Sequence, residues 1–425
     1  MLQADKPEKG DFLEVKYKSS TLRGTYIGTE KDLLTLKLEN GYNVSLPVSS
    51  ITILKHEGQK GQVNSGERVN TTTGSGRTRI TIITTGGTIA SRVDYSTGAV
   101  KPVRDLEFLS SSLPGLTERF TLELSEYGEI LSENMKPENW VSLGRSAKEL
   151  MKKSDGIVIT HGTDTMSYTS SALAFMFEKQ TAPIIFVGSQ RSSDRPSSDA
   201  FLNFRGAVEF SSTDFGEVGI AMHETISDDA IVLHRSVRSR KMHTSRRDAF
   251  RTIGSRPVGR FHADGVSLTP GYRKTAEETT FSHKLDSKVA LVYFSPTLTP
   301  EDLENICNNR KAVVLMGTGL GHVSTDLNNS IRRLTRDGLK IMMASQCIQG
   351  SVNMNVYSTG RLLREAGVIP LGSILPEVAY VKSMYVLANY DADDFEKIMQ
   401  ENLRGEIAER EIPSSLTWEV GRDAC

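Results

Sequence analysis

From Arg79 onward the sequence repeats one pattern that constrains its fold, because short apolar runs alternate with segments of helical periodicity. The runs are RITIITTGG from Arg79, GIVITHGTD from Gly156 and APIIFVGSQ from Ala182, followed by VGIAM and AIVLH. Helical periodicity is clear between them, at Trp140 to Met151 and at Tyr168 to Phe177. Continuous apolar strands joined by helices are typical of a parallel sheet covered on both faces. The pattern therefore predicts an α/β fold with a largely parallel sheet.

The first 57 residues follow a different pattern, in which apolar and polar residues alternate. The alternation is clear at Phe12 to Tyr17, Arg23 to Gly28 and Leu33 to Leu38. The dipeptide Asn40-Gly41 follows, and Asn-Gly favours a tight hairpin turn. Short strands joined by tight turns predict a small all-β barrel domain at residues 1–57. Residues 58–78 are rich in Gly, Ser, Thr and Asn, which predicts a flexible linker.

A second polar stretch divides the rest of the chain. Residues Thr269 to Lys288 interrupt the strand-helix alternation, which resumes at VALVYF, AVVLMG and IMMAS. We therefore predict an α/β domain at 79–270 that carries the strand-end motifs, a linker at 271–287, and a smaller α/β domain at 288–425. The length of 425 residues agrees with several folded units, since one ordinary domain has roughly 100 to 200 residues.

Charge, cysteine and histidine content exclude several classes of protein. The 51 Lys and Arg residues nearly balance the 52 Asp and Glu residues, so no global field attracts nucleic acid or lipid. Cys307, Cys347 and Cys425 form no CxxC pair or disulfide framework, which predicts reduced thiols and a cytoplasmic location. No apolar run approaches the roughly 20 residues of a membrane span. The eight histidines are scattered, with no HExxH motif, so no metal site is expected.

Two of the predicted strands end in residues that could carry chemistry. The first runs into Thr85-Gly86-Gly87 and the second into His161-Gly162-Thr163-Asp164. Ligands of open α/β sheets bind beyond the carboxyl ends of the strands, where glycines let backbone amides approach them. The simpler interpretations are a Gly-Gly turn with a capping hydroxyl at the first end and an N-cap at the second. Because a hydroxyl nucleophile needs a neighbouring base, the two ends could instead share one catalytic function.

A lysine for such a site lies in the strongly basic stretch from His234 to Arg260. This stretch contains nine Lys or Arg residues and a single acid, Asp248. Crowded cations favour the neutral form of a lysine, so Lys241 is a candidate partner of a strand-end threonine. A solvated basic face, or a patch that contacts RNA phosphates, would have the same composition. The composition supports these interpretations equally.

The strand-end motifs are similar to those of a known family. TTGGTIAS around Thr85 and THGTDTM around Thr163 resemble the two signature motifs of the bacterial-type L-asparaginase family, in the same order and at strand ends. Further similarity runs through SENM from Ser132, VGSQR from Val187, and RKMHT from Arg240. The sequences Gln346-Cys347 and VNMNVYSTG extend it toward the C-terminus. The resemblance covers roughly residues 79–425 and implies a two-domain asparaginase-like α/β fold.

The resemblance also implies the roles of particular residues. The catalytic set would be two threonines, an aspartate and a lysine, which fall on Thr85, Thr163, Asp164 and Lys241. One threonine would attack a side-chain amide and form an acyl-enzyme while ammonia leaves. Lys241 would tune Thr163, and Asp164 would hold the α-amino group of the substrate. The substrate pocket would be completed by side chains and by backbone amides that stabilise the oxyanion, namely Ser132, Glu133, Tyr95, Gly86 and Gly162. Many asparaginases carry Gln where this chain has Glu133.

The N-terminal β unit and the basic stretch resemble one branch of this family, the D subunits of archaeal glutamyl-tRNA(Gln) amidotransferases. That resemblance implies a glutaminase that passes ammonia to an E subunit, which uses ATP and Mg²⁺ to amidate Glu-tRNA(Gln). The expected assembly is a heterotetramer of two D and two E subunits, with tRNA(Gln) bound in the complex. The asparaginase-like part is expected to form a homodimer. No GxxxxGK[ST] phosphate loop occurs, so no cofactor is expected in this chain.

Two other functions agree with the same residues. The first is a free-standing cytosolic L-asparaginase with an accessory N-terminal domain, for which fast turnover of free asparagine would be the sign. The second is a catalytically silent, RNA-binding protein with an asparaginase-like fold. Intact RNA binding without any amidase activity would identify that function.

Overall fold

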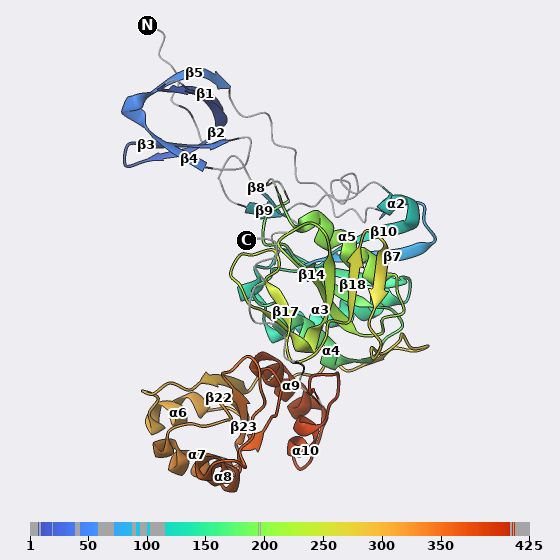
Figure 1. Ribbon diagram of the computed structural model, residues 1–425, viewed down its shortest axis with the longest axis vertical. Coiled ribbons are helices and arrows are strands. Elements are labelled where there is room, and N and C mark those ends of the chain that lie inside the picture. The colour runs from blue at the N-terminus through green and yellow to red at the C-terminus, as the bar shows by residue number, and fades with distance from the viewer. Residues whose placement is uncertain are drawn as a thin grey trace, which may run out of the picture.

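The computed structural model describes residues 7, 10–18, 20–38, 43–57, 72–86, 91–93, 100–102, 115–193, 195, 197–408, 410 and 412. Figure 1 shows three sheet-containing regions that follow one another in chain order along its vertical axis. They are a small N-terminal sheet, a large central sheet with helices on it, and a smaller C-terminal sheet with its own helices. The predicted position of Tyr95, and the predicted Asn-Gly turn, lie outside the described residues.

The N-terminal region is a curved antiparallel sheet of five strands in the order β4-β3-β2-β1-β5 (Figure 1). Alternate side chains point to one face and form a small core, which includes Leu13, Val15 and Leu36. The small all-β domain is thus confirmed as a sheet. Among the described residues, no ladder joins β4 to β5 and closes it into a barrel. The strands are β1 Phe12–Tyr17, β2 Ser20–Glu30, β3 Leu33–Leu38, β4 Asn43–Pro47 and β5 Ile51–Glu57.

The central sheet has nine strands in the order β19-β18-β15-β14-β13-β11-β7-β10-β6. The five from β14 to β10 in this order pair in parallel, as the apolar runs predicted. The bounds are β6 Thr72–Thr73, β7 Thr78–Thr84, β10 Phe120–Glu126, β11 Gly156–Thr160, β13 Ile184–Val187, β14 Val218–His223, β15 Ile231–Arg235, β18 Gly259–His262 and β19 Gly265–Leu268.

One predicted parallel strand is antiparallel in the structure. AIVLH forms β15, which pairs antiparallel with β14. The reason is the connection, since only residues 224–230 separate the two strands. A parallel crossover needs a dozen or more residues, so this connection can only turn back as a hairpin. The parallel part of the sheet therefore ends at β14.

Helices cover both faces of the central sheet because its strands are apolar on both sides. Ile83 and Ile159 point to the face covered by α3 and α4, whereas Ile82 and Val158 point to the face covered by α5. The period of two along each strand produces this division. The helices are α2 Leu116–Arg119, α3 Pro137–Met151, α4 Met166–Met176 and α5 Ala200–Ser211.

The two segments predicted to be linkers contain ordered strands. The first predicted linker, at 58–78, already includes β6, which pairs with β10, and the first residue of β7, Thr78. Within the second, β20 (Thr280–Phe281) pairs with β12 (Phe177–Lys179), and the ring centroids of Phe281 and Phe177 are 4.7 Å apart. Residues 271–287 therefore run along the central region and use an apolar side chain to pack on it.

The C-terminal region is a parallel sheet in the order β21-β22-β23-β24. Its helix α9 packs against both this sheet and α4, where the rings of Tyr385 and Phe175 stack with centroids 6.1 Å apart. A single apolar core therefore joins the two regions. The strands are β21 Val289–Tyr293, β22 Ala312–Gly317, β23 Lys340–Ser345 and β24 Ile369–Pro370. The helices are α6 Pro300–Cys307, α7 Asn328–Arg336, α8 Ser358–Glu365, α9 Pro376–Asn389 and α10 Phe395–Gln400.

Four further short strands pair outside the large sheets. They form two antiparallel pairs, β8 (Ser91–Val93) with β9 (Val100–Pro102) and β16 (Ser239–Lys241) with β17 (Phe250–Thr252). The second pair matters for function because it carries Lys241 at the end of β16. Among the helices of the described part of the chain, none is long and apolar enough to cross a membrane.

Candidate functional site

The two strand ends predicted to be reactive lie side by side. Strands β7 and β11 are parallel neighbours, with Thr84 directly opposite Thr160. Thr85 and Thr163 follow these two positions by one and three residues. The carboxyl ends of adjacent parallel strands meet at one edge of the sheet, which is where open α/β sheets bind ligands.

Thr85 is held closely against the neighbouring strand. Its hydroxyl donates to the carbonyl oxygen of Thr160 at 2.8 Å, and its backbone N–H donates to the same oxygen at 3.2 Å. Its side chain is fully buried. Gly86 follows with φ of +104°, a conformation that costs other residues free energy and lets the chain turn at the strand end. The predicted Gly-Gly turn is therefore present at its first glycine, and the Thr85 hydroxyl already has a backbone partner.

Thr163 makes the contact that the prediction required. The ammonium nitrogen of Lys241 lies 2.8 Å from Thr163 Oγ1 and 2.7 Å from Asp164 Oδ1. The lysine side chain is 13% exposed, whereas that of Asp164 is 69% exposed. Lys241 reaches the site from β16, 78 residues further along the chain than Thr163. The predicted lysine, threonine and aspartate are thus in direct contact.

Ser132 forms the opposite wall of this strand end. It begins the short 3-10 helix η3 (Ser132–Asn134), is 4% exposed, and its carbonyl oxygen accepts from Thr165 Oγ1 at 2.5 Å. A Cβ atom at Gly162 would lie 2.7 Å from Ser132 Cβ, so the close approach requires a glycine there. Ser132 Oγ donates to the carboxylate of the exposed Glu133 at 3.3 Å. Of the residues predicted to bind substrate, Ser132 therefore lies against the second motif, and Glu133 contacts Ser132.

A third strand end contributes a residue that the prediction of site residues omitted. Gly188 follows β13, and a Cβ atom there would lie 2.8 Å from Thr163 Cγ2 and 2.7 Å from Met166 Cε. The next two residues, Ser189 and Gln190, each bury a side-chain polar atom that has no hydrogen-bond partner in the described structure. The sequence signal was available, since VGSQR repeats the strand-glycine pattern of the two recognised motifs.

His161 is the buried member of the second motif. Its Nδ1 lies 2.7 Å from the carbonyl oxygen of Gly162, and the residue has no exposed surface. Burial lowers the pKa of the ring to about 4, although the Gly162 carbonyl partly opposes that shift. His161 is therefore neutral near pH 7 and adds no charge to the site.

The basic stretch at 234–260 is largely neutralised within the protein. Arg238 is fully buried and donates to the carbonyl oxygens of Ser373 and Glu406, and Arg240 lies 3.6 Å from the carboxylate of Glu377. Lys241 contacts the predicted Asp164 carboxylate and Thr163 hydroxyl, while the neighbouring arginines have partners that the sequence pattern did not reveal, so the expected crowding of cations is relieved. Further ion pairs join Arg235 to Glu217, Arg246 and Arg251 to Asp248, Arg247 to Asp228, and Arg260 to Glu224.

The arrangement provides the parts of a hydroxyl-nucleophile site. Thr163 has a hydroxyl within hydrogen-bond distance of a lysine amine, and such a partner can take the proton when the hydroxyl attacks. Thr85 is connected to the same edge through Thr160, but no hydrogen bond joins Thr85 to Thr163 in the described part of the chain. Within those same residues, no group of three His, Cys, Asp or Glu side chains is placed to hold a metal ion.

Models of two domain families match the chain. The first is "Asparaginase, N-terminal", which matches residues 79–274, and the second is "Glutaminase/Asparaginase C-terminal domain", which matches residues 288–400. The first includes both strand-end motifs and Lys241. Together they leave the N-terminal five-stranded sheet unmatched.

Relatives with assigned names match nearly the whole chain. The D subunit of glutamyl-tRNA(Gln) amidotransferase from Thermoplasma volcanium is 51% identical over 404 residues, which cover 95% of this chain and 99% of the relative. The protein of the same name from Sulfurisphaera tokodaii is 41% identical, over 97% of this chain and 94% of the relative. These alignments are longer than the two asparaginase domains alone.

Solved structures of asparaginases have the same fold over most of the chain. The thermostable L-asparaginase from Thermococcus kodakarensis superposes with a TM-score of 0.72 at 30% identity, covering 78% of this chain and 99% of that one. L-asparaginase I from Vibrio cholerae gives a TM-score of 0.68 at 29% identity, with the same coverage. The central and C-terminal regions thus have an asparaginase fold.

Proposed function

Because the chain belongs to the family of glutamyl-tRNA(Gln) amidotransferase D subunits, we propose that its own reaction is the hydrolysis of glutamine to glutamate and ammonia. The observation that carries this proposal is the contact of Lys241 Nζ with both Thr163 Oγ1 and Asp164 Oδ1. A threonine hydroxyl, a lysine and a carboxylate at a strand end can perform acyl transfer without a metal or cofactor. We assign the catalytic roles to Thr85, Thr163, Asp164 and Lys241.

The reaction proceeds in two steps. A threonine Oγ1 forms an ester bond with the side-chain carbonyl carbon of glutamine, the carbon–nitrogen bond breaks, and the nitrogen takes a proton and leaves as ammonia. Water then attacks the ester, which releases glutamate and restores the hydroxyl. Backbone N–H groups beside Gly86 and Gly162 stabilise the oxyanion that forms in both steps. Lys241 takes the proton of the Thr163 hydroxyl and passes it to the departing nitrogen, while Asp164 binds the α-amino group of the substrate.

Substitution of the two threonines tests the assignment. The variants Thr85→Val and Thr163→Val keep the side-chain volume and remove the hydroxyl, so each should lower the rate of ammonia release by about 10³-fold or more. Lys241→Met should have an effect of similar order, because Thr163 then lacks its partner. Ammonia release from glutamine and from asparagine should be measured for the full-length chain. A folded Thr163→Val variant that hydrolyses glutamine at the wild-type rate would refute the proposal.

The asparaginase alternative keeps one supporting observation, the fold shared with two L-asparaginases. The relatives that match nearly full length, however, carry the amidotransferase name. Comparison of the two substrates separates the functions. We expect glutamine to be preferred, and fast turnover of free asparagine by the isolated chain would instead identify a free-standing asparaginase.

We further propose that the chain works in the cytoplasm with an E subunit, as a heterotetramer of two D and two E subunits around a homodimer of this chain. The E subunit would use ATP and Mg²⁺ to activate Glu-tRNA(Gln). Co-expression with the gene of the partner and determination of the mass of the purified complex test the stoichiometry. Direct contact of this chain with tRNA should appear as an affinity that falls steeply with salt, and a flat salt profile would remove that role.

A further inference from the structure

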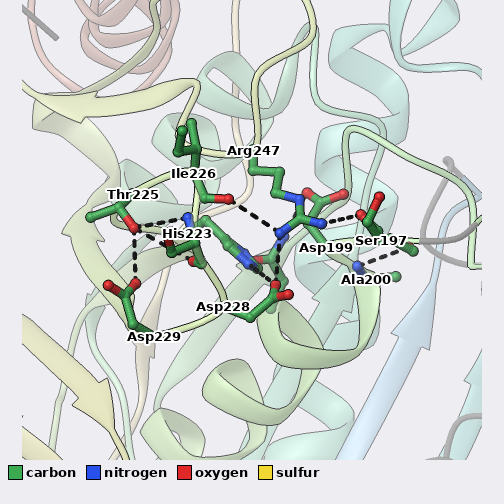
Figure 2. Close-up of polar contacts among 12 residues, drawn as sticks. Ser197, Asp199, Ala200, His223, Thr225, Ile226, Asp228, Asp229 and Arg247 are labelled. Atoms are coloured by element: carbon green, nitrogen blue, oxygen red, sulfur yellow. Dashed lines mark hydrogen bonds and ion pairs between the residues drawn. The ribbon is translucent and has the colours of Figure 1, made fainter. Parts of the chain in front are cut away.

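A series of polar contacts runs from the surface to the loop after β13, and Figure 2 shows His223, Asp228 and Asp199, which belong to it. At its outer end, Asp228 Oδ1 lies 3.0 Å from His223 Nε2. His223 Nδ1 lies 2.6 Å from Asn203 Oδ1, and Asn203 Nδ2 donates to Asp199 Oδ2 at 3.0 Å. His223, Asn203 and Asp199 have no exposed surface, whereas the Asp228 side chain is 59% exposed. The series connects an exposed carboxylate to a buried one through an imidazole and an amide.

The hydrogen-bond partners of Asn203 determine which of its amide atoms faces His223. Asn203 Nδ2 also donates to the carbonyl oxygen of Gly188 at 2.9 Å, so the amide nitrogen faces two acceptors and Oδ1 must face His223. His223 Nδ1 therefore donates. The other nitrogen of the same ring, Nε2, faces the Asp228 carboxylate. Asp228 is thus the second polar partner of a fully buried ring.

The inner end of the series holds the loop that contacts Thr163. The Asp199 carboxylate accepts from the backbone N–H of Gln190, at 2.9 and 3.1 Å, and from that of Arg191 at 3.0 Å. Asn203 holds Gly188 in the same loop, and a Cβ atom at Gly188 would lie 2.8 Å from Thr163 Cγ2. A small displacement of this loop would therefore change its packing against the Thr163 side chain.

The outer end is tied to the segment that continues from Lys241. Arg247, in the connection between β16 and β17, donates to Asp228 Oδ1 at 2.9 Å and to the carbonyl oxygen of Ile226 at 3.2 Å. Its other terminal nitrogen donates to the carbonyl oxygen of Ser197, a residue with φ of 56°. Figure 2 shows the Arg247 guanidinium lying between Ser197 and Asp228. Asp228 is therefore the point at which the Lys241 segment meets the buried series.

We propose that Asp228 and His223 are positioning residues for catalysis, which set the spacing between the loop at Gly188 and the Lys241–Thr163 pair. Two segments beside Thr163 are connected to the Asp228 carboxylate, the Gly188 loop through Asn203 and His223, and the Lys241 segment through Arg247. Neither positioning residue contacts Thr163, Asp164 or Lys241 in the hydrogen bonds of the site. This inference rests on the proposed glutamine hydrolysis, and it adds residues that act through others.

The test compares two neighbouring carboxylates on one exposed turn. Asp228→Ala removes the carboxylate that faces His223 Nε2 and accepts from Arg247, and we expect kcat for glutamine to fall about tenfold while KM changes less than about twofold. Asp229→Ala is the matched control, because the Asp229 carboxylate accepts instead from Thr225 Oγ1 at 2.8 Å. It should keep the wild-type kcat. Asp228→Asn retains an acceptor oxygen and should recover most of the lost rate.

Hydrogen exchange provides a second measurement that does not depend on activity. The backbone amides of Gln190 and Arg191 donate to Asp199, so they should exchange faster in Asp228→Ala than in the wild type or in Asp229→Ala. Unchanged kcat and unchanged exchange in Asp228→Ala would overturn the positioning role, as would an equal effect of Asp229→Ala. A wild-type complex that does not hydrolyse glutamine would overturn the proposed function itself. An active wild type with an unaffected Asp228→Ala variant would overturn only this inference.

Discussion

The two strand-end threonines are in different states, although their motifs are similar. The Thr163 hydroxyl is half-buried and in contact with the Lys241 amine, whereas the Thr85 hydroxyl is buried and donates to the carbonyl of Thr160. For Thr85 to attack a substrate, its hydroxyl must leave that carbonyl, which costs about 1 kcal/mol for one neutral hydrogen bond. This cost is small relative to a reaction barrier, so both threonines are available for the two-step reaction.

The buried neutral state of His161 makes stability depend on pH. Burial lowers the pKa of His161 to about 4, while the unfolded chain has a value of about 6.5. The unfolded state therefore binds more protons below pH 6.5, and stability should fall by about 2 kcal/mol between pH 7.5 and 5. His234, whose pKa burial lowers to about 3, adds an effect of the same sign. Urea unfolding at several pH values measures how steeply the free energy of unfolding changes with pH. His161→Gln should make that change smaller, and an unchanged pH dependence in this variant would contradict the argument.

At the scale of elements, the site depends on how closely η3 approaches the end of β11. A Cβ atom at Gly162 would lie 2.7 Å from Ser132 Cβ and 3.0 Å from Ser132 Oγ, so one wall must move when Gly162 is replaced. Gly162→Ala should lower kcat/KM for glutamine by about tenfold or more through this displacement. Its stability should fall by about 1–3 kcal/mol, as in overpacked cores.

Gly128→Ala is the matched control for this prediction. Gly128 lies in the connection that leads to η3, and the nearest atom to a Cβ there is Ile130 Cγ1 at 3.9 Å, an ordinary contact. This variant should retain wild-type activity. Steady-state kinetics and thermal unfolding of both variants provide the comparison. Equal losses in the two variants would show that general loosening of the segment, and not the approach to Ser132, reduces the rate.

At the scale of the molecule, a buried ion pair fastens the C-terminal segment to the rest. Lys382 on α9 and Glu406 lie 2.6 Å apart, and both side chains have no exposed surface. The backbone carbonyl of Glu406 accepts from Arg238, which precedes β16, and Arg404 donates to the carbonyl oxygen of Ala174 at the end of α4. The segment around Glu406 therefore connects the C-terminal region to the elements that carry the site.

Removal of one partner of this pair should be costly because it leaves an uncompensated buried charge. Lys382→Met should lower the free energy of unfolding by about 3–5 kcal/mol. The double variant Lys382→Met/Glu406→Leu removes both charges and should recover much of that loss. Denaturant unfolding of the two single variants and the double variant forms the cycle that measures the coupling. If the double variant lost as much free energy of unfolding as the two single variants together, the argument would be contradicted.

Periodicity and motifs in the amino-acid sequence were enough to predict the class of fold, the three regions and the strand ends at which Thr85 and Thr163 lie. These features follow from local periodicity and from short motifs, in which each residue acts on neighbours a few positions away. Local patterns cannot show how distant segments pair, which explains two wrong predictions. Periodicity did not distinguish the antiparallel strand β15 from the parallel strands. It also did not reveal that residues 271–287 pack on the central region. Lys241 could be selected as a candidate because it is the one lysine among the nine cations of its stretch, and the resemblance then gave it a catalytic role.

Which side chains are in contact follows from the packing of the assembled elements. Lys241 and Thr163 are 78 residues apart, Arg238 and Glu406 are 168 apart, and no local pattern encodes either contact. The buried series from Asp228 to Asp199 was likewise absent from the predicted site, since its members look like ordinary polar residues until β13, β14 and α5 bring them together. Long-range contacts arise from the packing of whole elements, so they become visible when the sheet and its helices are assembled in space.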